Sequence, residues 1–148
     1  MKEESIKYLK SIGMGDILIG RVEEIYKFYE EILTRLGDKI EDIFITDYIQ
    51  SDQSRQYENI LFFTSKYILE AKLFINQDDF DITPTKKRIV YIDIKKKDYD
   101  FKKAMDQSRL NVQILFGGQI ECQMKASREN CDYLRDITLT HIIPNLED

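Results

Sequence analysis

Eight basic residues in the second half of the chain are the side chains best suited to hold a charged ligand. They are Lys86, Lys87, Arg88, Lys95, Lys96, Lys97, Lys102 and Lys103. Gathered on one edge of a sheet, they could receive the phosphates of a lipid head group or a nucleic acid. The alternative is that lysines flanking a strand protect a sheet edge from aggregation. Protection of the sheet edge is the favoured interpretation, because the chain has a net charge of −5 and no glycine-rich phosphate loop.

The remaining reactive side chains are isolated from one another. His141 is the only histidine, and its position predicts a structural residue on the apolar side of a helix. The only cysteines, Cys122 and Cys131, fall on apolar sides of a predicted strand and helix, as small buried hydrophobes do. Their spacing fits no zinc motif, and an intracellular setting argues against a disulfide between them.

No constellation of residues predicts catalysis. The chain contains no nucleophile elbow, Walker loop, dinucleotide fingerprint or HExxH sequence. An acidic stretch lacks the glycine turn and distant glutamate of an EF-hand and is expected to be a solvated loop; its carboxylates are Asp78, Asp79 and Asp81. We therefore expect a protein that is not an enzyme and that uses no metal and no cofactor.

Length and composition predict one domain spanning residues 1–148. The chain is 43% hydrophobic and 33% charged, which is ordinary for a folded protein. Apolar runs are too short to span a membrane, and the first residues lack the apolar core of a signal peptide. These features predict a cytoplasmic protein, and the frequent Ile and Lys with few Ala indicate a bacterial or phage origin.

Two helices are expected before residue 38. Residues 3–12 form the shorter, which ends at Gly13. The longer begins at Asp16 and ends before Gly37. Its apolar stripe is Leu18, Val22, Ile25, Tyr29, Ile32 and Leu36, widened by Ile19, Tyr26 and Leu33. We expect this stripe to pack on the protein's own sheet; a coiled-coil homodimer through helix 16–36 is the alternative.

The next segments alternate as strands do. The period changes from Ile40 onward to that of a strand with apolar or aromatic side chains on both faces, where Ile43, Ile45 and Ile49 alternate with Phe44, Thr46 and Tyr48. Residues 60–75 form a hairpin. Placing Ile60 and Phe62 opposite Leu69 and Ala71 requires a loop of two or four residues. Residues 76–85 are expected to be a loop. The following strand, 89–95, is expected to direct Val90, Ile92 and Ile94 inward, before a loop with one turn at 95–108.

A second hairpin at residues 110–126 surrounds the pair Gly117-Gly118. A two-residue loop would place Glu121 and Gln123 on the buried face. One more loop residue turns every side chain of the second strand to the other face, so we expect a loop of three residues. The favoured loop is 116–118, which pairs Ile114 with Ile120; the loop 117–119 preserves the same parity.

The last helix is expected at residues 128–143, with Ser127 as its N-cap and Pro144 at its end. Its inward positions are Cys131, Leu134, Ile137 or Thr138, His141 and Ile142. The fold class is α+β, with a helical N-terminal element (1–37) followed by an antiparallel sheet of five to seven strands and a closing C-terminal helix (38–148).

The order of these elements over residues 40–145 resembles the pleckstrin-homology-like superfold, including its bacterial and GRAM-type members. The resemblance rests on the hairpin from Asn59 to Ala71 (Ile60-Leu61-Phe62-Phe63-Thr64, turn, Tyr67-Ile68-Leu69), the later strands and the helix after Ala126. It implies a partial barrel and an interaction module, because members mostly bind peptides, proteins or lipid head groups. The superfold has no invariant catalytic motif, so it implies no site residues.

Three functions follow as hypotheses. The leading one is a non-catalytic module that binds a protein or peptide through an edge strand or the groove beside the last helix. The second is binding of anionic lipid or nucleic acid through the basic segment at residues 84–103. The third is a small acidic phage-type inhibitor of a nucleic-acid-binding enzyme, suggested by the acidic ends of the chain.

Overall fold

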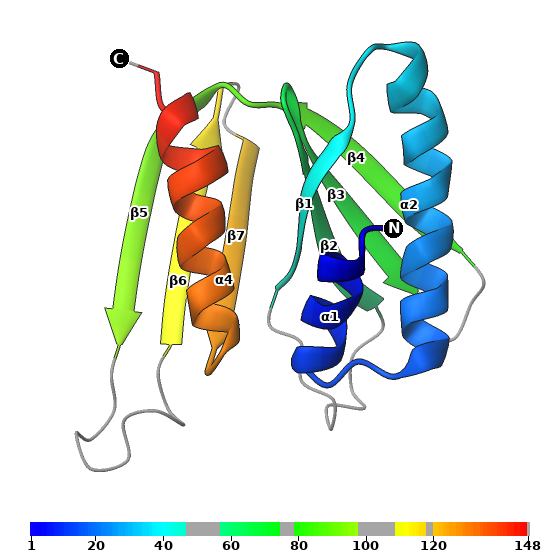
Figure 1. Ribbon diagram of the computed structural model, residues 1–148. Coiled ribbons are helices and arrows are strands. Elements are labelled where there is room, and N and C mark those ends of the chain that lie inside the picture. Colours follow the sequence, from blue (N-terminus) through cyan, green and yellow to red (C-terminus); the bar gives the residue numbers. More distant parts are fainter. Residues whose placement is uncertain (47–56, 75–78, 98–108, 118–119, 148) are drawn as a thin grey trace. The chain divides into compact units, whose positions relative to one another are not determined.

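The computed structural model of the chain describes residues 1–46, 57–74, 79–97, 109–117 and 120–147 (Figure 1). Contacts divide the chain into two compact units, Met1–Thr85 and Lys86–Asp148. The first holds two helices and a four-stranded sheet of order β1-β2-β3-β4. The second holds a three-stranded sheet of order β5-β6-β7 and the C-terminal helix. The α+β class and the upper end of the expected strand number are therefore confirmed, whereas the single domain stays a prediction.

Helices α1 (Glu3–Ser11) and α2 (Asp16–Arg35) both end in the way that the glycines predict. Gly13 and Gly37 have φ angles of 91° and 70°, in the left-handed region. The amide of Met14 donates to the Leu9 carbonyl, and the amide of Asp38 donates to the Leu33 carbonyl. Each helix thus ends in a Schellman motif, which satisfies carbonyls that would otherwise lack a donor.

The buried face of α2 is shifted from the predicted stripe. Its buried side chains are Ile19, Val22, Ile25, Tyr26 and Leu33. Ile32 and Leu36, which the stripe placed inward, are exposed. The apolar arc of α2 is wider than the surface that the sheet covers, so Val22 and Ile25 of the stripe are buried together with the three residues expected to widen it. One flank of the helix remains apolar and exposed.

The strands of the first unit are β1 (Ile40–Ile45), β2 (Tyr57–Thr64), β3 (Tyr67–Phe74) and β4 (Phe80–Lys86). Phe62 lies opposite Leu69 and Ile60 opposite Ala71, which confirms the predicted register and the two-residue loop. Tyr8 of α1 reaches β1, where its hydroxyl accepts a hydrogen bond from the Ile45 amide at 3.0 Å. The buried Tyr8 therefore joins α1 to an edge strand of the sheet.

Strand β4 corrects the expectation of a loop over residues 76–85. The acidic composition and Pro84 argued against a strand, because proline cannot donate to a ladder. Pro84 is tolerated here since β4 is at the edge of the sheet, where one side of the strand needs no partner. Asp79 and Asp81 are exposed, and Asp78 lies outside the described residues.

In the second unit, β5 (Ile89–Lys97), β6 (Arg109–Phe116) and β7 (Ile120–Ser127) form an antiparallel meander. Ile114 lies opposite Cys122 and Phe116 opposite Ile120, so the loop is 117–119. The parity argument is confirmed, but the favoured loop 116–118, with Ile114 opposite Ile120, is wrong. A shift of two residues preserves every inward side chain, so the apolar pattern cannot distinguish the two loops.

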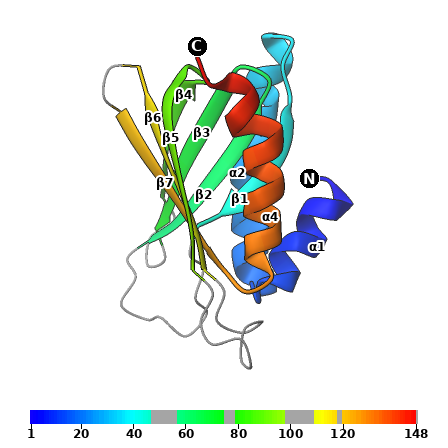
Figure 2. The ribbon, with the colours of Figure 1, turned by 90° about the vertical axis from the view of Figure 1, so that its left-hand side faces the viewer.

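The C-terminal helical segment begins later than expected. It consists of α4 (Asn130–Ile137), a π-helical turn (Thr138–Ile142) and a 3-10 turn (Ile143–Asn145). Ser127 ends β7 and is not the N-cap. The π turn precedes Pro144, which has no amide to donate and whose ring would clash with the preceding helical turn. Figure 2 shows α4 lying along one face of the β5–β7 sheet.

The expected inward side of this helical segment is largely confirmed. Leu134, His141 and Ile142 are buried, and Cys131 is half-buried. Ile137 and Thr138, offered as alternatives, are both buried. In the part of the chain that the structure describes, no helix is long and apolar enough to cross a membrane.

Candidate functional site

The structure separates the predicted basic residues into two groups along β5. Lys86, Lys87 and Arg88 precede the strand, whereas Lys95, Lys96 and Lys97 end it. Lys95 follows Arg88 by seven positions of extended chain, a distance of about 23 Å. Lys102 and Lys103 lie outside the described residues. One compact phosphate would therefore reach only one group at a time.

Several of these cations already have polar neighbours within the second unit. Arg88 Nε donates to Glu147 Oε1 at 2.8 Å, and this hydrogen bond and the carboxylate charge raise the pKa of the guanidinium. Lys95 Nζ lies 3.5 Å from Asp93 Oδ2. Both pairs are exposed, so each stabilises the fold only slightly. A phosphate would have to compete with these carboxylates.

His141 is buried, as predicted for a structural histidine. Its Nδ1 lies 2.9 Å from Lys87 Nζ. The Lys87 ammonium group has only protons to donate, so Nδ1 is the acceptor in this contact. Lys87 is thus directed toward the interior of the unit rather than toward a ligand.

Cys131 lies at the start of α4, close to the end of β5. Burial and the neighbouring Asp132 raise the pKa of its thiol, whereas the Leu110 backbone and the charges of Arg109 and Lys96 act in the opposite direction. A raised thiol pKa means little thiolate at neutral pH, so Cys131 is poorly suited to act as a nucleophile. Among the described residues, no three His, Cys, Asp or Glu side chains gather as a metal site would require.

In the described chain, the outer edge of β5 is largely unpaired and carries exposed apolar side chains. β5 is an edge strand, and among the described residues only Ile89 forms a bridge on the side away from β6, to Leu146. Val90, Tyr91 and Ile94 expose about half of their surface. The expected burial of Val90 and Ile94 is therefore wrong, although Ile92 is half-buried.

Two features explain this outcome. The register between β5 and β6 shifts between Ile89 and Tyr91, which leaves Val90 in a bulge. Ile94 lies opposite the buried Val112 but on an edge strand, and α4 packs over β6 and β7. The period-2 pattern of the sequence predicted the face of Ile94 correctly and could not show that the helix stops short of it.

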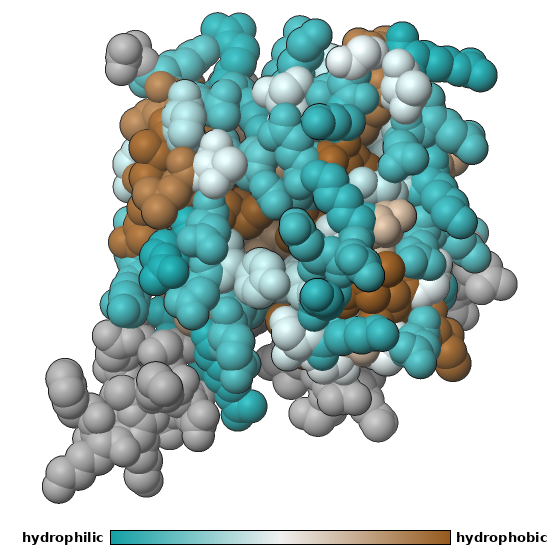
Figure 3. All heavy atoms as spheres, in the orientation of Figure 1, coloured by the Kyte–Doolittle hydropathy of each residue, from teal (hydrophilic) through white to brown (hydrophobic). Residues whose placement is uncertain are grey.

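The C-terminal segment adds further exposed apolar side chains to the same unit, namely Tyr133, Leu139, Ile143 and Leu146. In Figure 3 one of the brown patches lies on the left, over β5 and the adjoining helix. Glu147 continues the contact of the C-terminal segment with β5, because its amide donates to the Ile89 carbonyl at 2.8 Å. An exposed strand edge beside apolar side chains can bind an extended polypeptide.

Comparison of the chain with protein-family models, with curated proteins and with solved structures gave no significant match.

Proposed function

We propose that the protein is a non-catalytic interaction module that binds an extended segment of a partner protein along the outer edge of β5. The observation that carries this proposal is the edge from Val90 to Ile94. It combines backbone groups on an edge strand with half-exposed apolar side chains. Main-chain hydrogen bonds would supply affinity, and the side chains of alternate residues would supply selectivity.

The distribution of charge along β5 favours this proposal over simple protection of an edge. Lysines protect a sheet edge from pairing with another chain when they lie on the edge strand itself. Here the basic residues flank β5, with Arg88 before it and Lys95 and Lys96 at its end. Between them, Val90, Tyr91 and Ile94 expose apolar side chains. Because the lysine end is basic, the partner segment is expected to carry acidic residues where it passes that end.

The order of elements supports the resemblance to the pleckstrin-homology-like superfold. Four strands in one sheet, three strands in a second and a C-terminal helix follow one another in the chain. On this proposal the two sheets belong to a partial barrel, and the segment before residue 38 is an addition to it. Fold analogy alone carries little weight for function, so the proposal rests on the β5 edge.

The test begins with linear peptides selected from a random phage-displayed library on the full chain. The affinity of the selected peptides is then measured for the wild type and two variants. Ile94→Glu places a charge on the proposed site; Ile120→Glu is the matched control, because Ile120 is 50% exposed against 49% for Ile94 and lies on the opposite edge strand. We expect Ile94→Glu to weaken binding about tenfold or more and Ile120→Glu to leave it unchanged.

Hydrogen exchange locates the peptide independently. Amides of residues 90–94 should become protected in the complex. Selected peptides that bind both variants equally, or protection confined to other strands, would refute the proposal. Binding to phosphatidylserine vesicles that weakens with salt and is lost after charge reversal of Lys95, Lys96 and Lys97 would favour a phosphorylated ligand instead.

A further inference from the structure

Two residues of the chain itself lie on the edge of β5 that the proposed function assigns to a partner. Leu146 forms a parallel bridge with Ile89, and the amide of Glu147 donates to the Ile89 carbonyl at 2.8 Å. Glu147 Oε1 also accepts the hydrogen bond from Arg88 Nε at 2.8 Å. Residues 146–147 thus occupy the start of this edge as a short strand would, and we call them the covering segment.

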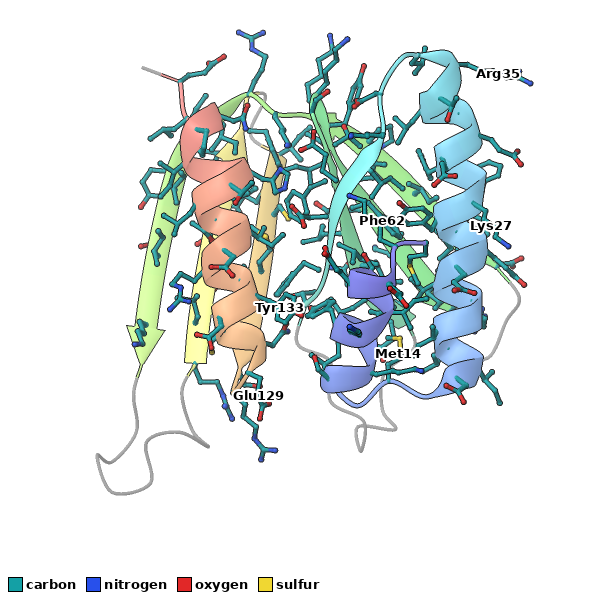
Figure 4. All side chains as sticks on the ribbon, in the orientation of Figure 1. Met14, Lys27, Arg35, Phe62, Glu129 and Tyr133 are labelled. Carbon is teal, nitrogen blue, oxygen red and sulfur yellow. The ribbon has the colours of Figure 1, made fainter. Side chains whose placement is uncertain are left out.

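The C-terminal helical segment carries these residues to the start of β5. Figure 4 labels Glu129 and Tyr133 where α4 begins, and the helical segment runs from there along the sheet to the start of β5. After the 3-10 turn, Leu146 adopts an extended conformation, with φ of −69° and ψ of 123°. Extended backbone can pair with a strand edge, so the end of the helical segment permits the contact with Ile89.

The covering segment is held less firmly than the helix before it. His141 and Ile142 are buried, whereas Leu146 is 43% exposed. The ion pair of Arg88 and Glu147 is exposed as well, because 73% and 42% of the two side chains are accessible. Exposed ion pairs stabilise only slightly, and each backbone hydrogen bond adds a modest amount. The covering segment can therefore leave β5 while the helix stays in place.

A partner that binds the proposed site meets the covering segment. An extended chain that pairs with residues 90–94 and continues by one or two residues reaches Ile89, whose carbonyl already accepts the Glu147 amide. A carbonyl at a strand edge forms its ladder hydrogen bond with one neighbouring strand, so the partner and the covering segment compete for it. The same chain brings a side chain to Arg88, which the covering segment satisfies with a carboxylate.

We propose that the covering segment is an intramolecular competitor, which the partner displaces from the start of β5, and that an acidic residue of the partner then replaces Glu147 on Arg88. This inference rests on the proposed function, because it concerns the same edge. Competition lowers the affinity of the partner by the fraction of molecules in which the edge is free. With two weak contacts to break, this factor is roughly five to ten.

Two substitutions of residue 147 test the competition, with the peptides selected on the wild-type chain as the probe. Glu147→Ala removes the carboxylate and retains the amide. Glu147→Pro also removes the amide that donates to Ile89, and it suits the extended Leu146, because the residue before a proline favours that conformation. We expect the peptides to bind about threefold more tightly to Glu147→Ala and about five- to tenfold more tightly to Glu147→Pro.

Glu121→Ala is the matched control for the change of charge. Glu121 is exposed on β7, the opposite edge strand, and its replacement changes the net charge as Glu147→Ala does. A general attraction of acidic peptides to a less acidic protein would strengthen binding equally in the two variants. Competition at the edge requires Glu121→Ala to bind the peptides as the wild type does. Circular dichroism of each variant checks that the fold is intact.

Arg88→Gln tests whether an acidic residue of the partner replaces Glu147. In the Glu147→Ala background the covering segment is already loosened, so Arg88→Gln should weaken peptide binding about threefold. In the wild type the same substitution also releases the covering segment, so the loss and the gain should nearly cancel. Equal effects of Arg88→Gln in the two backgrounds would overturn this exchange of carboxylates.

Hydrogen exchange of the Glu147 amide reports displacement directly. This amide is bonded to Ile89 in the free protein and should exchange about five- to tenfold faster when the peptide saturates the site. Unchanged exchange, or residue-147 variants that bind the peptides as the wild type does, would overturn the competition. If Ile94→Glu still weakens binding in that case, the proposed function stands without it; if Ile94→Glu has no effect, both fail.

Discussion

Replacing Phe62 by alanine tests the assignment of the core in the first unit. Phe62 is completely buried in β2, opposite Ile43 of β1 and Leu69 of β3. Its ring meets that of Tyr26 of α2 edge to face, with centroids 6.2 Å apart. The side chain thus contacts two neighbouring strands and the helix above them, and its removal leaves a cavity that these elements cannot readily close.

The expected cost follows from these contacts. Truncation of a buried phenylalanine to alanine usually lowers the free energy of unfolding by ~3–5 kcal/mol. The upper half of that range applies here, because the aromatic pair with Tyr26 adds ~0.5–1.5 kcal/mol to the loss of burial. A domain is stable by only about 5–15 kcal/mol, so the variant would lose a large part of its stability.

Urea denaturation followed by circular dichroism measures this loss. Phe62→Leu retains most of the volume and should cost less than half as much. Ser127→Ala is the control and should cost less than about 0.5 kcal/mol, because Ser127 is only half-buried, ends β7 and does not cap α4. A loss of less than about 1 kcal/mol for Phe62→Ala, or equal losses for Phe62→Ala and Ser127→Ala, would show that the burial assigned to β2 is wrong.

Further predictions concern α2 and its end. Gly37→Ala should destabilise the chain by about 1 kcal/mol, because φ is +70° there, whereas Gly20→Ala inside α2 should stabilise it by ~0.5–1 kcal/mol, since an added Cβ meets nothing within 4 Å; thermal unfolding of both variants checks the opposite signs. The Asp38 carboxyl has a lowered pKa, because its hydrogen bonds from Lys39 and Ser65 outweigh the opposing effect of burial. Its stabilising effect should therefore be present above the unfolded pKa of about 3.9 and be lost as the pH falls through the folded pKa. Asp38→Asn should unfold more readily than the wild type at pH 7 and equally readily at low pH; a difference that persists in acid would contradict this assignment.

Patterns of period and parity predicted much of the fold, and the failures have local causes. Gly37 ends α2 as expected, because only the backbone conformation of one residue is involved. Val90 was expected to point inward because the alternation of the sequence does not show where a bulge lies. Pro84 argued against β4 because a proline is tolerated only in an edge strand, and the sequence does not show which strands are at an edge.

The candidate site was harder to predict than the fold. The edge position of β5 depends on which strands pair, and its exposure depends on which strands α4 covers; both are decided by long-range packing. The sequence did show the basic residues, but it could not show that Arg88 pairs with Glu147 or that Lys87 contacts His141. Long-range contacts of this kind leave no local pattern.

The first and last described residues of the second unit lie close together. Ile89, at its first strand, bridges Leu146, and Arg88 holds Glu147. The chain therefore returns to the point where the unit began. Proteins with neighbouring ends tolerate circular permutation, in which the ends are joined and the chain is opened elsewhere. In a circular permutant of the second unit, a short linker would therefore connect residue 147 to the start of the unit, and the new ends would lie in another loop. Every strand of the sheet would keep its place.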